Sequence, residues 1–346
     1  MRAAVLRNPG DIVIKDIPRP TIKETEILLE VEVCSICGTD RKIYEKGHEK
    51  IAGRQILGHE LAGEIVEVGR EVEYFKPGMK ITMPPYLGCG HCRYCLRGLN
   101  HLCVDVRHYG VDLPGGFAEY FKIDQKAINQ GSIVEIPEDM SFSTGALVEP
   151  LACCFNAYQS LDIAPDENLL IFGAGSMGNI NLLLNKILGT REIIMVDIDK
   201  LRLSFSKELK ADYVVNNQNE DLSQKIERIT RGKGVDNLIT AVPSAEVQKQ
   251  ALDLLSVKGS INFFAGLSQD EEIFVNTNNI HYNQYKLTGT SDSSVKQFRQ
   301  SMDIASGRPG TIKKIITEKV RLKDLESIFD DENFFRKNLK IQVDMS

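Results

Sequence analysis

The chain has 346 residues, a length that predicts two domains rather than one or four. Its composition, 42% hydrophobic and 26% charged residues, is that of a globular protein and excludes disorder or a collagen-like repeat. The 42 basic and 48 acidic residues give a net charge of -6, which offers no general attraction to nucleic acid or anionic membrane and favours a small-molecule partner.

The N-terminal segment reaches charged residues before an apolar run long enough for a signal peptide, so we expect a cytoplasmic protein. The longest uncharged stretch, residues 168 to 185, contains three glycines, whereas a membrane-spanning helix needs about 20 mostly apolar residues. In a cytosolic chain of this size, eight cysteines are more typical of metal ligands, catalytic groups or core residues than of disulfides.

From Met1 to about Glu149 the sequence shows short β-rich runs separated by proline and glycine turns. The clearest runs cover residues 27–33, 64–68 and 117–123. This texture predicts an irregular, mostly antiparallel β domain.

From about residue 151 to residue 286, strands alternate with helical stretches, as in a doubly wound parallel sheet. The six candidate strands are residues 169–172, 193–196, 213–215, 238–242, 260–265 and 286–289. The helix after the first strand has one apolar face and a stop signal at Gly189. No second α/β block follows, so we expect residues 1–150 and 287–346 to form one domain and residues 151–286 the other.

The strongest motif is a group of four cysteines within fifteen residues, Cys89, Cys92, Cys95 and Cys103. Four thiolates can surround one tetrahedral zinc ion at about 2.3 Å per bond, which predicts a closed structural site in a lobe over about residues 86–106. An iron-sulfur cluster is an alternative, since it is also held by four cysteines. A nucleic-acid-binding zinc module is another, although the acidic balance of the chain argues against it.

A second candidate metal site combines Cys37, His59 and Glu60 with the more distant Glu149. One thiolate, one imidazole and one or two carboxylates match a catalytic zinc that keeps a position open for substrate. Spacing alone does not establish this site, because Cys34 and Cys37 also fit a redox pair. The cysteines that we expect in the core are Cys34, Cys153 and Cys154.

The third motif is a glycine-rich loop that follows an apolar strand and opens a helix. Its glycines allow a pyrophosphate to approach the helix N-terminus, and Asp197, at the end of the next strand, is placed to accept hydrogen bonds from a ribose. A turn that merely packs a helix on a sheet would explain the glycines but not Asp197. Because a carboxylate repels a 2'-phosphate, NAD is favoured over NADP. The predicted dinucleotide contacts here are Gly173, Gly175, Ser176, Met177, Gly178 and Asp197, with Val242 at the end of the fourth strand.

Taken in order along nearly the whole chain, these motifs resemble the zinc-containing medium-chain dehydrogenase/reductase superfamily, and within it the sorbitol (polyol) dehydrogenase-like branch. The resemblance rests on residues 37–40, 58–60, the four-cysteine lobe, 115–119, 149–151 and 173–178. It implies an α/β fold, with a GroES-like β-rich catalytic domain, a Rossmann domain and an active site in the cleft between them.

The resemblance also assigns roles to single residues. It implies a catalytic zinc held by Cys37, His59 and a carboxylate, either Glu60 or Glu149. Alcohol dehydrogenases of the family have a cysteine where this chain has Glu149, which favours a polyol or threonine dehydrogenase. Thr39 matches the hydroxyl that takes the substrate proton, and Asp40 matches a residue that braces the metal site. The remaining family cofactor positions are Arg202, Phe264, Gly266 and Thr290.

One departure concerns the proton relay, because the family usually has a histidine where this chain has Lys42. Lys42 with a depressed pKa, or water, would have to replace it, and His48 is a remote candidate. Arg41, Lys42 and Lys46 also make this segment basic. Such charges are usually solvated, but they are also suited to binding a phosphate on the substrate.

We therefore predict a zinc- and NAD-dependent oxidoreductase that oxidises a secondary alcohol of a polyol or sugar to a ketone. Two zinc ions per subunit, one catalytic and one structural, and a homotetramer or dimer follow from the resemblance. The alternatives are a sugar-alcohol-phosphate dehydrogenase, an L-threonine 3-dehydrogenase and a non-catalytic module that binds zinc and nucleotide.

Overall fold

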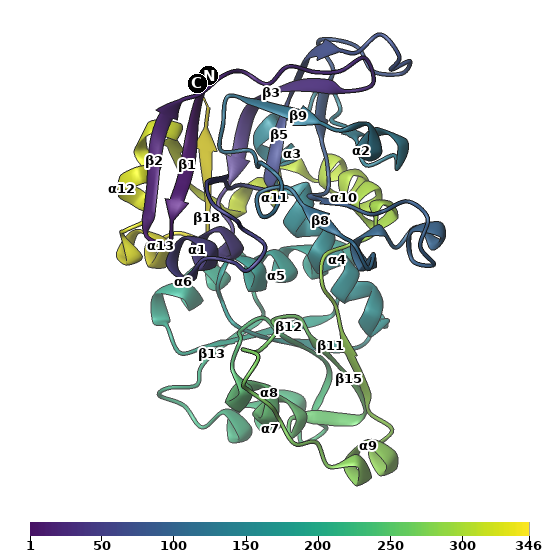
Figure 1. The fold of residues 1–346 in the computed structure, drawn as a ribbon. Helices are drawn as coiled ribbons and strands as arrows, with labels where there is room; N and C mark the ends of the chain where they lie inside the picture. Colours follow the sequence, from purple (N-terminus) through teal and green to yellow (C-terminus); the bar gives the residue numbers. More distant parts are fainter. Residues whose placement is uncertain (346) are drawn as a thin grey trace. The chain divides into compact units, whose positions relative to one another are not determined.

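The computed structural model describes residues 1–345. The chain forms two compact units (Figure 1). Unit 1 comprises Met1–Ala152 together with the residues from Ser293 onward, and unit 2 is Cys153–Asp292. The boundaries lie two and six residues beyond the expected ones. Residues 287–292 fall in unit 2 because the strand that begins at Lys286 pairs with its sheet.

Unit 1 is built mainly from antiparallel strands. Its largest sheet has the order β10-β6-β5-β3-β18-β17, and β9 also pairs with β3. The bounds are β3 (Ile27–Ser35), β5 (Glu60–Val68), β6 (Lys80–Thr82), β9 (Tyr120–Ile123), β10 (Val134–Glu135), β17 (Ile316–Arg321) and β18 (Lys340–Asp344). A smaller sheet contains β1 (Arg2–Asn8), β2 (Asp11–Asp16) and β4 (Gln55–Ile56). Because β18 pairs with β3, the last strand of the chain lies beside one of the first.

Short helices connect these strands. They are α1 (Gly38–Lys46), α2 (Gln125–Asn129), α3 (Phe142–Gly145), α10 (Val295–Gly307), α11 (Pro309–Ile312), α12 (Leu325–Ile328) and α13 (Glu332–Lys337), with α4 (Val148–Leu161) leading into unit 2. A two-stranded pair, β7 (Tyr86–Leu87) with β8 (Arg107–His108), closes the base of the four-cysteine lobe. The predicted strand at residues 117–123 begins only at Tyr120, since the residues before it bond to other segments outside a regular ladder.

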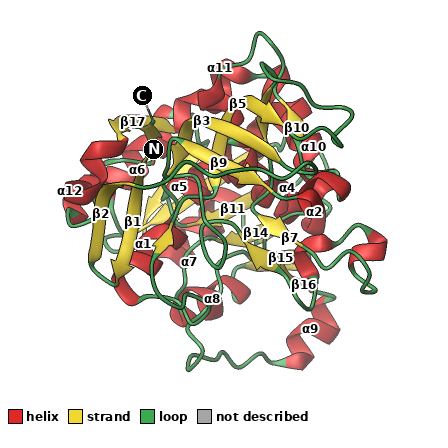
Figure 2. Ribbon diagram, turned by 45° about the horizontal axis from the view of Figure 1, so that its top comes forward, coloured by secondary structure: helices red, strands yellow, loops and turns green. Residues whose placement is uncertain are grey.

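Unit 2 contains one parallel sheet with the strand order β13-β12-β11-β14-β15-β16. The strands are β11 (Asn168–Phe172), β12 (Glu192–Asp197), β13 (Tyr213–Asn216), β14 (Val235–Thr240), β15 (Leu255–Phe263) and β16 (Lys286–Gly289). The helices are α5 (Ser176–Leu188), α6 (Lys200–Glu208), α7 (Leu222–Thr230), α8 (Ala245–Leu252) and α9 (Thr277–Asn283). Numbered within the unit, this order is the 3-2-1-4-5-6 arrangement of a doubly wound sheet, which confirms the predicted α/β class (Figure 2).

The sequence pattern explains why these strands form the centre of unit 2. Every residue of β11 is buried, as expected for a strand covered on both faces. All six predicted strands are present, but two are shifted: β14 ends at Thr240 rather than 242, and β15 runs from Leu255 to Phe263 rather than from 260 to 265. Among residues 1–345, no helix combines the length and apolar character that a membrane crossing requires.

Candidate metal and dinucleotide sites

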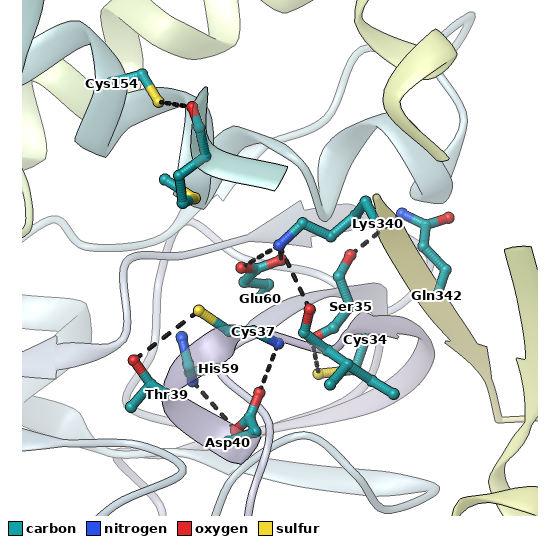
Figure 3. Close-up of polar contacts among 12 residues, drawn as sticks. Cys34, Ser35, Cys37, Thr39, Asp40, His59, Glu60, Cys154, Lys340 and Gln342 are labelled. Carbon is teal, nitrogen blue, oxygen red and sulfur yellow. Dashed lines mark hydrogen bonds and ion pairs between the residues drawn. The ribbon is translucent and has the colours of Figure 1, made fainter. Parts of the chain in front are cut away.

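Pairing between β3 and β5 brings the first candidate metal ligands together. Ser35, at the end of β3, lies opposite Glu60, at the start of β5. Cys37 follows β3 directly, and His59 precedes β5, so both reach the same end of the sheet. The ligand atoms of Cys37, His59 and Glu60 all lie within 4.8 Å of one another. Three of the four expected ligands therefore lie together within unit 1 (Figure 3).

Asp40 organises the backbone and the imidazole of this cluster. It is fully buried at the start of α1, where it accepts hydrogen bonds from the Cys37 N–H at 2.9 Å and the Gly58 N–H at 3.0 Å. Its Oδ1 also lies 3.5 Å from Nδ1 of His59, which leaves Nε2 for a metal. Gly58 has φ +89°, and a Cβ there would meet the Cys34 sulfur at 2.8 Å, so glycine is required beside His59.

The electrostatics around His59 favour a cation at this position. Burial alone lowers the pKa of His59, but the charges of Asp40 and Cys37 outweigh burial and raise it well above its usual value. The cluster thus concentrates negative charge around the imidazole. A divalent cation bound here would compensate the negative charges of Asp40 and Cys37 without protonation of His59.

Lys340 forms a buried ion pair with Glu60 that sequence reasoning missed. Its Nζ lies 2.7 and 2.8 Å from the two carboxylate oxygens, and the side chains of Lys340 and Glu60 are 1% and 0% exposed. Burial raises the pKa of Glu60, against the opposing effect of the Lys340 charge. Burial lowers the pKa of Lys340, but the Glu60 charge outweighs it and the net shift is upward. No motif surrounds Lys340, and only the pairing of β18 with β3 brings it here.

Glu149, the other candidate carboxylate, is buried near the start of α4. Glu149 does not belong to the group that Cys37, His59 and Glu60 form. Its charge nevertheless helps to raise the pKa of Lys340, so both carboxylates act on the same ammonium group. Lys340 thus compensates the charge of Glu60 through direct contact and that of Glu149 at longer range.

The residues expected to contact substrate and proton lie on α1. Thr39 and Lys42 are exposed, three positions apart on the helix, and the Thr39 hydroxyl is 3.9 Å from the Cys37 sulfur. Arg41, by contrast, pairs with Glu45 at 3.1 Å and lies 4.2 Å from the centre of the Phe335 ring. Both of these contacts of Arg41 are with residues of unit 1, which weakens the hypothesis that Arg41 binds a phosphate.

The donor set of the first cluster fits zinc. It offers a thiolate, an imidazole nitrogen and a carboxylate in a partly buried position, the ligand types found at catalytic zinc sites. Cys34, the neighbouring cysteine, is completely buried and packs in the core of unit 1 as predicted. Cys154 is also buried, whereas Cys153 is half-buried, and all eight cysteines carry free thiols.

The four-cysteine lobe has the spacing of a single tetrahedral ion. Bonds of 2.3 Å to four sulfurs place those sulfurs about 3.8 Å apart. The Cys92 sulfur lies 3.6 Å from that of Cys95 and 3.8 Å from that of Cys103, and those of Cys89 and Cys95 are 4.0 Å apart. A backbone hydrogen bond from Cys95 lowers the pKa of Cys92 to about 6. This geometry fits one zinc ion better than an iron-sulfur cluster, which places several metal atoms between its thiolates.

The glycine-rich loop in unit 2 is shaped for a close ligand. A Cβ on Gly178 would lie 1.7 Å from the Gly173 carbonyl, so the helix packs against the turn only with glycine there. Nothing lies within 4 Å of the Cβ position of Gly175. The Ser176 hydroxyl is buried and has no hydrogen-bond partner among the residues that the structure describes. The bare backbone and unsatisfied hydroxyl at the N-terminus of α5 fit a dinucleotide phosphate.

The remaining candidate cofactor residues follow the carboxyl ends of the strands of the parallel sheet. Asp197, at the end of β12, accepts hydrogen bonds from the N–H groups of Ala174 and Asp199 at 2.6 and 2.8 Å. Val242 follows β14 and packs on Gly173, and the Thr290 hydroxyl donates to Asn262 at 3.2 Å. The other expected positions are Met177 at the start of α5, Arg202 on α6, and Phe264 and Gly266 after β15.

Comparisons with known proteins relate the chain to zinc-binding dehydrogenases. The family model of the alcohol dehydrogenase GroES-like domain matches residues 23–138, and that of the zinc-binding dehydrogenase matches residues 176–307. The chain is 31% identical over 334 residues to an uncharacterised zinc-type alcohol dehydrogenase-like protein of Escherichia coli (strain K12), covering 95% of this chain and 94% of that protein. It is 29% identical over 348 residues to a sorbitol dehydrogenase of Bacillus subtilis (strain 168), covering 99% and 97%.

Solved structures give the same result for the fold. A crystal structure from Sinorhizobium meliloti 1021, described as a zinc-binding dehydrogenase bound to NADP, is 26% identical and has a TM-score of 0.90. The match covers 99% of each chain.

Proposed function

Because the chain belongs to the zinc-containing medium-chain dehydrogenase/reductase superfamily and is an oxidoreductase of its alcohol and polyol dehydrogenase class, we propose that it oxidises a secondary alcohol of a polyol or sugar to a ketone, with NAD as hydride acceptor. The observation that carries the proposal is the buried cluster of Cys37, His59 and Glu60 beside the exposed hydroxyl of Thr39. We further propose that Glu149 belongs to this site and that the four-cysteine lobe holds a second, structural zinc ion.

The protein side chains divide the work of this reaction. Cys37 and His59 would hold the ion, while Asp40 fixes both of them through the Cys37 N–H and the imidazole. When bound, zinc would lower the pKa of a coordinated alcohol as it does for water, and the nicotinamide would accept the hydride. Thr39 receives the hydroxyl proton, and Lys42, one turn further along α1, or water passes it to solvent.

NAD is the proposed cofactor rather than NADP because of Asp197. A carboxylate at the end of β12 accepts hydrogen bonds from the ribose hydroxyls of NAD, whereas its negative charge would repel the 2'-phosphate of NADP. The relative bound to NADP makes this a point to test directly. We expect a higher kcat/KM with NAD than with NADP. The Asp197→Ser substitution should reduce the ratio of these two kcat/KM values.

The test is NADH formation over a panel of free polyols, sugar-alcohol phosphates, L-threonine and simple secondary alcohols, with zinc-loaded and chelated protein side by side. Zinc-dependent turnover of free polyols supports the proposal. A preference for phosphorylated substrates that falls in Lys42→Ala and Lys46→Ala would favour the sugar-alcohol-phosphate alternative. Turnover of L-threonine alone would favour a threonine dehydrogenase. No turnover of any substrate would favour a non-catalytic module that binds zinc and nucleotide.

A paired substitution tests the proton path. Thr39→Val removes the hydroxyl with little change in volume and should lower kcat by roughly 100-fold or more. Thr39→Ser keeps the hydroxyl and should retain most of the activity. Equal activity in the two variants would contradict the role of Thr39.

A further inference from the structure

Helix α5 buries three asparagines directly after the glycine-rich loop. Asn179, Asn181 and Asn185 are each 0% exposed. Buried amides are uncommon and stabilise a fold only when their hydrogen bonds are made, so each of these positions serves a specific contact. Asn179 is the one whose contacts reach the loop.

The amide of Asn179 binds two loop carbonyls and a neighbouring helix. Its Nδ2 donates to the carbonyl of Ala174 at 2.6 Å and to that of Gly175 at 3.1 Å. Its Oδ1 accepts a hydrogen bond from the hydroxyl of Ser206, on α6, at 2.8 Å. Because carbonyl groups only accept hydrogen bonds, these contacts determine which way the amide points.

Fixing these carbonyls also fixes the N–H groups that follow them. In a planar trans peptide the C=O and the next N–H point in opposite directions. The Asn179 side chain holds the carbonyls of Ala174 and Gly175, and the Asn179 backbone N–H also binds the Gly175 carbonyl at 3.0 Å, so the N–H groups of Gly175 and Ser176 point away from Asn179. The open space beside Gly175 and the unsatisfied hydroxyl of Ser176 lie at these same residues.

Without this restraint the loop has an alternative conformation available. Glycine adopts positive and negative φ with similar ease, so the peptide between Ala174 and Gly175 can rotate. Rotation would present a carbonyl oxygen, rather than an N–H group, to a bound phosphate. Asp197 accepts a hydrogen bond from the N–H of Ala174, but this bond leaves the carbonyl of Ala174 unrestrained.

We propose that Asn179 is a positioning residue for the dinucleotide: it holds the Ala174 and Gly175 carbonyls so that the loop N–H groups stay directed at the phosphates, and Ser206 holds Asn179. The inference rests on the proposed function, since it requires that the loop bind NAD. It concerns a residue outside the glycine pattern, whose contribution comes through the backbone rather than through contact with the cofactor.

The test compares Asn179→Leu with Asn185→Leu in the full chain. Asn185 is the matched control because it is on the same helix, is equally buried, and makes two side-chain hydrogen bonds against the three of Asn179, to the Asn181 carbonyl at 2.9 Å and from Thr190 at 3.1 Å. We expect both variants to lower Tm. Only Asn179→Leu should weaken NADH binding, by about tenfold for the loss of its hydrogen bonds. The same variant should raise KM for NAD with little change in kcat.

If Asn179→Leu does not fold, Ser206→Ala supplies the same comparison more gently, with Ser204→Ala on the exposed face of α6 as its control. An equal change in NADH affinity in the test and control variants, or none in either, would overturn the role of Asn179. A wild-type protein that binds neither NADH nor NADPH would instead overturn the proposed function, and this inference with it.

Discussion

Replacing Lys340 by methionine tests how the buried ion pair controls the candidate catalytic metal site. Both Lys340 and Glu60 are shielded from water, and the ammonium reaches both carboxylate oxygens. Removing one partner of such a pair leaves an uncompensated buried charge and costs about 3–5 kcal/mol. Methionine keeps nearly the volume of lysine, so this cost is electrostatic rather than the result of a cavity.

Zinc should recover part of that cost. The Glu60 carboxylate lies within 4.8 Å of the ligand atoms of Cys37 and His59, and without Lys340 it is available to a cation bound there. If binding recovers about 1.4 kcal/mol of the loss, linkage requires zinc affinity to increase about tenfold. We therefore expect Lys340→Met to be destabilised mainly in its zinc-free form and to bind zinc more tightly than the wild type.

Two assays measure these quantities. Thermal unfolding with and without zinc gives the change in stability, and competition with a chromophoric chelator gives the affinity. The double variant Glu60→Gln/Lys340→Met replaces the pair by neutral groups and should regain stability while losing the gain in zinc affinity. Unchanged or weaker zinc binding in Lys340→Met would refute the reasoning that Lys340 competes with the metal for Glu60.

Three further predictions concern the other charged and metal-binding groups. Asp40→Asn should weaken zinc binding by about 10–100-fold in the same chelator assay, because His59 loses the carboxylate that orients it. Cys95→Ser should reduce the zinc content from two ions per chain to one, measured by elemental analysis, and make the surrounding lobe sensitive to protease; two ions would contradict a zinc site there. The pKa of Asp112 is lowered because the His108 N–H and Arg107 outweigh the opposing effect of burial. Its stabilisation is thus present above the unfolded pKa and lost as pH falls through the folded pKa, so Asp112→Asn should have a lower Tm than wild type at neutral pH and the same Tm at strongly acidic pH.

The sequence predicts those parts of the fold that depend on local patterns. Six strands alternate with helices in unit 2, and α5 ends at Gly189, which adopts the left-handed conformation that the glycine stop signal predicts. Strand ends were less accurate, as β14 and β15 show, because they depend on which neighbouring strand supplies hydrogen bonds rather than on composition. The same limit applies to the unit boundary near residue 292, which is set by the pairing of β16.

The site residues follow the same division. The four-cysteine spacing could be interpreted from the sequence alone, because its ligands are neighbours in the chain. Lys340 could not be identified, since it is 280 residues from Glu60 in the sequence and reaches it only because β18 and β5 both pair with β3. Asn179 is next to the glycine motif in sequence, but its importance depends on Ser206, 27 residues away on another helix.

These differences have a common physical origin. A metal or phosphate site needs groups that contact the ligand, and their chemistry restricts them to a few residue types at regular spacings, which produces a recognisable motif. The groups that hold those contacts in place need only compensate charge or complete a hydrogen bond, and many side chains from many directions can do so. Two chains with the same motif residues can therefore differ in metal or cofactor affinity through positions such as Lys340 and Asn179. Substituting these two positions should change the affinity of each proposed site while leaving its ligand-contacting residues intact, which would separate the contribution of the supporting groups from that of the motif.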